Sequence, residues 1–272
     1  MIPPAPSESD APKLADRPAE VPLALQGVSV SYQVIHGDES DAVLFDATVA
    51  FKSGAMTAII GPNGAGKSTL LHAALGLVPT LCGEVTFFGQ PFEKVRARVA
   101  FLPQRESVDW DFPITVLDVV RMGATSGLGW WIPPFIKRLV GGTGENDRTR
   151  EALARVGMED FAKRPIGDLS GGQQQRVFLA RALAQNADVV LLDEPFAGVD
   201  AATEELLLNE LKALAQGGRT VIAVHHDLDT VALHFDEAVL IQRTIQKVGP
   251  AREVLGSPAA LRIFGPRAVQ AG

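Results

Sequence analysis

Residues 61–69 read Gly-Pro-Asn-Gly-Ala-Gly-Lys-Ser-Thr, and this stretch decides the fold. It fits the phosphate-binding pattern G-x-x-x-x-G-K-[ST]. The glycines let the backbone bend so that several N–H groups point into one concavity. Because the stretch follows an apolar run at 56–60 and precedes a helix predicted over 67–77, an ordinary glycine-rich turn is a poor explanation. The sequence therefore predicts a strand, a phosphate-binding loop and a helix, in that order.

The predicted loop supplies most of the contacts that we expect with a bound nucleotide. Lys67 should reach the β- and γ-phosphates, the Ser68 hydroxyl should bind Mg²⁺, and Thr69 should help to hold the α-phosphate. The positive end of the helix dipole adds to the attraction for phosphate. The residues expected to contact the nucleotide here are Gly61, Pro62, Asn63, Gly64, Ala65, Gly66, Lys67, Ser68 and Thr69.

A pair of carboxylates lies further along the chain. Residues 188–192 form an apolar run that predicts a buried strand, and Asp193 and Glu194 follow it directly. At the end of such a strand, Asp193 would bind the Mg²⁺ beside the loop, and Glu194 would polarise the attacking water as a general base. Alone, this pattern would equally fit a solvated acidic turn. With the phosphate-binding loop upstream, a nucleotide-hydrolysing site is the better interpretation.

Strand-like and helix-like segments alternate through the rest of the chain. Their order favours an α/β fold with a parallel sheet covered on both faces by helices. The predicted strands are 25–32, 42–51, 56–60, 84–88, 98–101, 188–192 and 220–224. The predicted helices are 67–77, 115–122, 146–156, 174–184 and 201–216.

Length and composition agree with a folded core flanked by two tails. A chain of 272 residues with 46% hydrophobic content is long enough for one large α/β domain or two small ones. Residues 1–22 are rich in proline and in small or charged residues, so we expect a flexible tail there. Residues 257–272 carry little structural signal and are expected to form a C-terminal tail.

Charge and cysteine content exclude several classes of function. A net charge of −7 argues against binding nucleic acid by a basic surface, although it leaves a local nucleotide site possible. The single Cys excludes an internal disulfide and a zinc site built on paired cysteines. The N-terminus has no signal-peptide pattern, and no run of about 18 apolar residues predicts a membrane span.

A third motif narrows the class. Residues 169–173 read Leu-Ser-Gly-Gly-Gln and precede the helix predicted over 174–184, and they resemble the signature motif of ATP-binding cassette (ABC) ATPases. Ser170 could also simply cap that helix, and the two roles are compatible. A Ser side chain and a helix N-terminus together form a second anion site. The resemblance implies that Ser170, Gly171, Gly172 and Gln173 of one copy close on the ATP held by a second copy.

Other positions of the ABC pattern follow in order. Tyr32 stands where the family places an aromatic ring that stacks on adenine, although an edge-strand or core role remains open. Gln104, after the strand predicted over 98–101, matches the Q-loop glutamine that touches Mg²⁺ and water in the family. Residues 197–200 match the D-loop, which crosses the dimer interface, and Asp200 ends it.

A histidine that contacts the γ-phosphate completes the set. The resemblance assigns this switch role to His226, because the family places its histidine directly before an acidic residue, here Asp227. His225 is the competing choice. His72 and His234 belong to no motif and are interpreted as structural.

The resemblance to ABC ATPases covers residues 23–256 and implies a P-loop NTPase fold. The expected parts are a RecA-like core, an antiparallel β subdomain, and a helical subdomain over 105–168. Since every catalytic motif is present, with Lys67, Gln104, Glu194 and His226 in place, we expect an active ATPase that uses ATP and Mg²⁺.

Within the family, a lone cassette without membrane helices resembles the ATPase subunit of a bacterial importer. Residues 108–113, Val-Asp-Trp-Asp-Phe-Pro, are similar to the manganese/zinc/iron importer ATPases. This implies a separate permease, an extracytoplasmic metal-binding protein, and a place on the cytoplasmic face of the inner membrane. An importer of iron chelates, or an ABC ATPase of translation or DNA repair, is the alternative. Trp110 and Phe112 would line the permease groove or pack the helical subdomain, and the sequence leaves both open. The same choice applies to residues 128–135.

Overall fold

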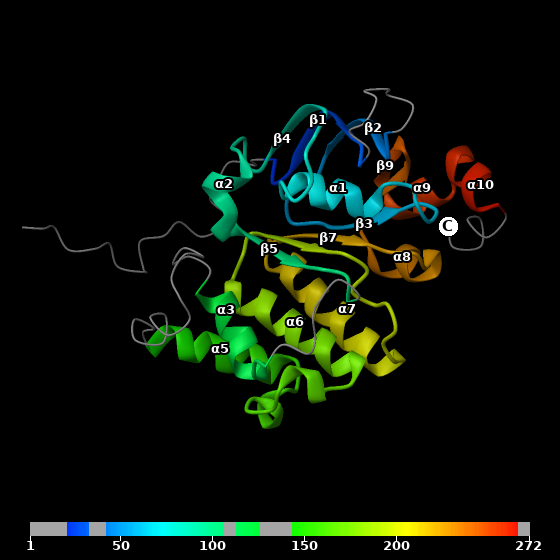
Figure 1. Ribbon diagram of the computed structural model, residues 1–272. Helices are drawn as coiled ribbons and strands as arrows, with labels where there is room; N and C mark the ends of the chain where they lie inside the picture. Colours follow the sequence, from blue (N-terminus) through cyan, green and yellow to red (C-terminus); the bar gives the residue numbers. More distant parts are fainter. Residues whose placement is uncertain (1–20, 33–41, 106–112, 126–142, 266–272) are drawn as a thin grey trace, which may run out of the picture.

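The computed structural model describes residues 21–32, 42–105, 113–125 and 143–265 (Figure 1). Its centre is a six-stranded sheet in the order β5-β6-β7-β3-β8-β9. The strands β5, β6, β7, β3 and β8 are mutually parallel, and β9 runs antiparallel to β8 at the edge. The strands of this sheet are β3 Met56–Ile60, β5 Val99–Leu102, β6 Val189–Leu192, β7 Thr220–Val224, β8 Glu237–Gln242 and β9 Thr244–Pro250.

A second, three-stranded antiparallel sheet covers one side of the first (Figure 1). Its order is β2-β1-β4, with β1 Ala24–Val30, β2 Leu44–Ala50 and β4 Cys82–Thr86. The Phe45 N–H donates to the Arg243 carbonyl at 2.7 Å, which ties β2 to the β8–β9 turn. Helix α1 Lys67–Ala74 is sandwiched between the two sheets.

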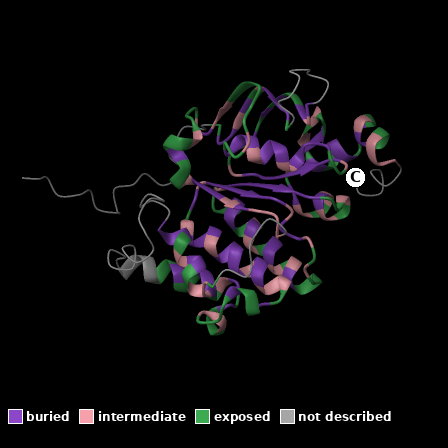
Figure 2. Ribbon diagram, in the orientation of Figure 1, coloured by how far each residue is buried: buried purple, intermediate pink, exposed green. Residues whose placement is uncertain are grey.

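Strands β3, β6 and β7 at the centre of the sheet are buried at every residue (Figure 2), and their alternate residues belong to two separate core clusters. Val189 and Leu191 of β6 belong to the cluster that packs around α1 and the small sheet. Val190 and Leu192 belong to the cluster under the opposite face. Because successive strand residues point to opposite faces, an entirely apolar strand is what a sheet covered on both sides requires.

Helices cover that opposite face. Helices α6 Gly171–Gln185 and α7 Ala201–Gln216 lie under the sheet, and α3 Val116–Ala124 and α5 Thr143–Arg155 pack beside α6 (Figure 1). Arg155 forms an ion pair with Glu210 that joins α5 to α7. The remaining short helices are α2 Phe92–Val95, η4 Arg96–Arg98, η7 Glu159–Phe161, η8 Ile166–Asp168, α8 Leu228–His234, α9 Ala251–Leu255 and α10 Pro258–Phe264.

The predicted parallel sheet covered on both faces is confirmed, with differences at the sheet edge and toward the C-terminus. Strands β8 and β9 were not predicted, and β9 makes the sheet mixed. The sequence predicts a tail over 257–272, whereas α10 lies in that range, with Ala260 fully buried. Ser257 begins α10 by accepting the Ala260 N–H at 3.2 Å, and the proline at the first helical position is a start signal that the prediction overlooked.

Some predictions fall on residues outside the described part. These are the tail over 1–20, Trp110 and Phe112, and the stretch 128–135. Within the described ranges, no helix is both long enough and apolar enough to cross a membrane.

Candidate functional site

The predicted site residues meet at one edge of the central sheet. Strands β5, β6, β7 and β3 are neighbours in that order, and each is followed by a segment that the sequence singles out. Gln104 follows β5, Asp193 and Glu194 follow β6, His226 follows β7, and the glycine loop follows β3. Because parallel strands end at the same edge of a sheet, these connections lie side by side, and α/β sheets bind ligands in the crevice outside this edge.

The glycine loop is held tightly against the sheet. A Cβ on Gly61 would lie 2.2 Å from the Ile241 carbonyl oxygen, so the backbone passes too close to β8 for any side chain. Gly66, with φ of 95°, is the N-cap of α1 and offers no side-chain cap. The first N–H groups of α1 therefore face the loop without a capping oxygen, as an anion site requires.

The Lys67 ammonium lies inside the loop that carries it. Nζ donates to the carbonyls of Gly61 and Pro62, both at 3.0 Å. Burial lowers the pKa of Lys67, while the carboxylates of Glu194 and Asp193 oppose that change. Among the described residues no carboxylate contacts this buried ammonium, so it is well placed to donate to phosphate oxygens.

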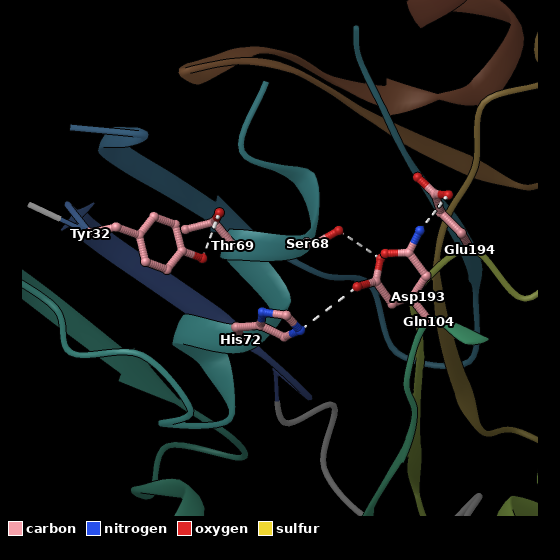
Figure 3. Close-up of polar contacts among 7 residues, drawn as sticks. All are labelled: Tyr32, Ser68, Thr69, His72, Gln104, Asp193 and Glu194. Carbon is pink, nitrogen blue, oxygen red and sulfur yellow. Dashed lines mark hydrogen bonds and ion pairs between the residues drawn. The ribbon is translucent and has the colours of Figure 1, made fainter. Parts of the chain in front are cut away.

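Asp193 is the most buried carboxylate of the site, with 1% exposure. Its Oδ1 accepts the Ser68 hydroxyl at 2.8 Å, and its Oδ2 lies 3.7 Å from His72 Nε2 (Figure 3). Burial raises the pKa of the Asp193 carboxyl, and the Ser68 hydrogen bond partly offsets this. A buried carboxylate is unfavourable unless a partner offsets its charge. The Asp193 carboxylate and the Ser68 hydroxyl together offer the oxygen ligands that Mg²⁺ prefers.

Glu194 and Gln104 lie next to each other, just after the neighbouring strands β6 and β5. Gln104 Nε2 donates to Glu194 Oε2 at 3.3 Å (Figure 3). Glu194 has a φ of 50°, a left-handed backbone that is uncommon for a side chain of this type. The two consecutive carboxylates therefore have different partners: Asp193 accepts from Ser68 of α1, and Glu194 accepts from Gln104.

Tyr32 lies at the other end of the same site. Its hydroxyl and the Thr69 hydroxyl are 3.2 Å apart, and its side chain is 56% exposed (Figure 3). An exposed ring anchored beside the first turn of α1 is open to stacking by a flat ligand. The geometry favours this role over that of a core tyrosine.

The signature segment forms a separate group. Ser170 caps α6 by accepting the Gln173 N–H, and Gln173 accepts the Ser170 N–H at 3.0 Å, which completes a capping box. Within the described residues, these hydrogen bonds stay inside the segment and do not reach the glycine loop. Asp200 caps α7 and accepts from the Thr203 N–H and hydroxyl, at 2.8 and 3.1 Å. The structure thus places Asp200 beside the signature helix, since a Cβ on Gly172 would meet its carboxylate at 3.4 Å.

Comparison with known proteins decides the family. The family described as ABC transporter matches residues 44–197, which is more than half of the chain. The chain belongs to the ABC transporter family. It is an ABC ATPase, and the fold and activity expected from its motifs are confirmed.

Curated relatives of this ABC ATPase are transport subunits. It is 52% identical over 225 residues to a zinc transport system ATP-binding protein of Treponema pallidum, covering 83% of this chain and 82% of that one. It is 44% identical over 246 residues to a manganese transport system ATP-binding protein of Bacillus subtilis, covering 90% and 93%. The resemblance to metal importer ATPases is therefore confirmed.

Solved structures agree on the fold. A metal-chelate type ABC transporter in an inward-facing conformation matches with a TM-score of 0.72 and 26% identity, covering 89% of this chain and 88% of that one. An ATP-binding cassette in its ADP conformation matches with a TM-score of 0.71 and 24% identity, covering 89% and 97%. The second likeness supports the fold alone.

Sequence reasoning missed two features of the ABC ATPase site. His72 was interpreted as structural, yet it lies beside Asp193. Since Ser68 and His72 are four residues apart on α1, they share one face of the helix, and this spacing was the available signal. Arg105 Nε donates to Gln174 Oε1 at 3.1 Å, which links the segment after Gln104 to the signature helix. No motif carries that contact.

The two histidines after β7 have different surroundings. His226 is exposed, whereas His225, the residue before it, is 2% exposed. The exposed position supports His226 as the residue that meets a ligand.

Proposed function

We propose that this ABC ATPase hydrolyses ATP to drive uptake of a divalent metal ion, Mn²⁺, Zn²⁺ or Fe²⁺, through a separate membrane permease. The observation that carries the proposal is the high identity, over most of both chains, to relatives named for zinc and manganese transport. The likeness to a metal-chelate type transporter is weaker, at 26% identity. Uptake of an iron chelate is therefore the second candidate.

ATP would bind along the crevice from Tyr32 to the glycine loop. The Tyr32 ring would stack on the base, and the backbone N–H groups from Gly61 to Gly66 would receive the phosphates. Lys67 would exchange its two carbonyl partners for phosphate oxygens. That exchange is favourable because a bond between two charged groups is stronger than one to a neutral carbonyl.

The oxygen donors beside the loop fit Mg²⁺. Ser68 Oγ and Asp193 Oδ1 already lie 2.8 Å apart, and the Asp193 carboxylate is buried without a lysine or arginine bonded to it in the described contacts. We assign Ser68, Asp193 and the Gln104 amide oxygen as the groups that hold the ion. When bound, Mg²⁺ would offset negative charge on the phosphates.

Glu194 is proposed to take the proton of the attacking water, since it is half-buried at the edge of the crevice and bonded to the neutral Gln104 amide. The exposed imidazole of His226 would contact the γ-phosphate. Lys67 would stabilise the charge that develops on the transferred phosphoryl group.

A second copy of the chain would complete the site. Ser170, Gly171, Gly172 and Gln173 form an exposed helix N-terminus that stays apart from the glycine loop of the same copy. We propose that it closes on the ATP of the second copy, with Asp200 at the interface. Closure on ATP and release after hydrolysis would bias a bound permease between two access states.

The remaining partners follow from the importer role. The ATPase would sit on the cytoplasmic face of the inner membrane, bound to the permease. Selection of the metal would belong to the permease and to an extracytoplasmic binding protein. We propose no nucleic-acid partner, in keeping with the net charge of −7.

Metal uptake in a deletion strain tests the transport proposal. Loss of radiolabelled Mn²⁺, Zn²⁺ or Fe²⁺ uptake, restored by the wild-type chain, is the expected result. Unchanged uptake of all three ions, together with loss of iron-chelate uptake, would favour the second candidate. Copurification with ribosomes or DNA in place of a multi-helix membrane protein would contradict a transport role.

A matched pair of variants tests the catalytic assignment. Glu194→Gln should keep ATP binding and lower kcat by at least about a hundredfold, because a general base typically contributes that much. Glu205→Gln removes the same charge from an exposed position on α7 and should leave kcat unchanged. Full activity of Glu194→Gln would refute the role of Glu194.

A further inference from the structure

His225 follows β7 directly, and its imidazole is buried in the protein. The residue is 2% exposed. Its Nδ1 accepts hydrogen bonds from the next two backbone N–H groups, those of His226 at 2.9 Å and of Asp227 at 3.1 Å. An acceptor shared by two consecutive amides fixes the backbone that carries His226.

The imidazole is neutral in this position. Burial, followed by the neighbouring His226, lowers the pKa of His225 from 6.5 to about 4. In a neutral imidazole one nitrogen accepts and the other carries the proton, so the proton is on Nε2. Nε2 has no hydrogen-bond partner among the described residues. The polar group that the fold uses here is therefore the acceptor at Nδ1.

Aromatic contacts join the same ring to the segment after Glu194. His225 stacks on Phe196, with ring centroids 4.9 Å apart, and meets the edge of Phe235 at 5.7 Å. Phe196 lies two residues beyond Glu194, and the Ala197 N–H donates to the Glu194 carbonyl at 3.2 Å, which closes that turn. One side chain thus holds the backbone of His226 by hydrogen bonds and the turn of Glu194 by stacking.

We propose that His225 is a positioning residue that keeps the His226 side chain at a fixed place relative to Glu194. His225 itself does not touch the nucleotide. The inference rests on the proposed contact of His226 with the γ-phosphate. Loss of the Nδ1 acceptor should lower kcat and the affinity for ATP, because both depend on the contact with the γ-phosphate. The affinity for ADP, which has no γ-phosphate, should stay unchanged.

Three substitutions at His225 separate the acceptor from the ring. His225→Asn carries its oxygen on Cγ, where Nδ1 is attached, so it keeps an acceptor and loses the ring. His225→Phe keeps the ring that stacks on Phe196 and loses the acceptor. His225→Gln moves the acceptor one bond further from the backbone.

The kcat and KM of each variant are measured with Glu194 intact. The affinities for fluorescent ATP and ADP analogues are measured in the Glu194→Gln background, which binds ATP without turnover. His225→Phe should lower kcat by roughly tenfold to a hundredfold, as small misplacements of reacting groups do. It should also weaken ATP binding and keep ADP binding at the wild-type level. His225→Asn should keep more activity than His225→Phe or His225→Gln, because it alone keeps the acceptor at the right distance, and its remaining loss would reflect the missing stack on Phe196.

Several outcomes would overturn the proposal. They are full activity of His225→Phe, equal activity of the Asn and Gln variants, and a parallel loss of ATP and ADP affinity. If His225→Phe fails to fold, the comparison of Asn with Gln decides. His226→Ala keeps the two proposals distinct: an unchanged ATPase rate there would refute the γ-phosphate role, whereas a low rate there with an active His225→Phe would refute the positioning role alone.

Discussion

Acidification should destabilise the folded chain through His225, and the size of this effect follows from its burial. In the unfolded chain the imidazole titrates near 6.5, whereas burial lowers the pKa to about 4 in the folded chain. A group whose pKa is lowered by folding contributes stability that is complete above the unfolded value. That contribution is lost as the pH falls from 6.5 toward 4. Protonation of Nδ1 would also place a third N–H against the amides of His226 and Asp227.

The magnitude can be worked out from these two values. From about pH 8 to about pH 5, the unfolded imidazole becomes almost fully protonated while the folded one stays mostly neutral. A pKa difference of about 2.5 is worth about 3.4 kcal/mol when complete, and about 2 kcal/mol of this is lost by about pH 5. Such a loss is a large fraction of the stability of an ordinary domain.

Urea unfolding followed by far-ultraviolet circular dichroism measures this loss. The His225→Asn variant is the control, because it has no imidazole at this position and keeps His226, Asp227 and His234, the other charged groups that influence His225. The wild type should lose about 2 kcal/mol more than the variant between the two pH values. Dilute protein is needed, since the lower value lies close to the isoelectric point of 5.3. Parallel losses in both proteins would refute the buried neutral imidazole.

Other substitutions test further parts of the site. Gly61→Ala should lower the free energy of unfolding by about 1–3 kcal/mol in urea titrations, because its Cβ would lie 2.2 Å from the Ile241 carbonyl. Tyr32→Ala should weaken binding of a fluorescent ATP analogue by roughly threefold to tenfold, whereas Tyr32→Phe, which keeps the ring, should bind like the wild type. Arg105→Ala and Gln174→Ala should each destabilise the fold, and a double-mutant cycle should give a coupling of about 1 kcal/mol for their 3.1 Å bond; additive effects would exclude that contact.

Local patterns predicted the central layers of the fold well and its margins poorly. The strands at 56–60 and 220–224 and the helix at 201–216 match the structure residue for residue. Apolar runs with clear stop signals locate such elements. Strand β9 has no comparable apolar run, and its residues are half-buried or exposed. It is held in the sheet by its pairing with β8. Pairing of that kind comes from tertiary structure, which a local pattern does not contain.

The site divides in the same way. Residues that bind through the backbone or through fixed motif positions, such as Lys67, Ser68 and Asp193, could be placed from sequence because the loop and the strand ends impose their location. His72 reaches Asp193 through helix spacing, and His225 reaches Phe196 across the sheet edge. These contacts depend on which elements become neighbours. The spacing that puts His72 on the same helix face as Ser68 is visible in the sequence, whereas nothing in the sequence indicates that His225 meets Phe196.

The contacts within the site also explain how it stays folded without ATP. Lys67 bonds to carbonyls of its own loop, the Ser68 hydroxyl bonds to Asp193, and Gln104 bonds to Glu194. Each of these bonds joins a charged group to a neutral one, so none of them is an ion pair that ATP would have to break. Binding of ATP and Mg²⁺ would therefore replace bonds between a charged and a neutral group by bonds between opposite charges.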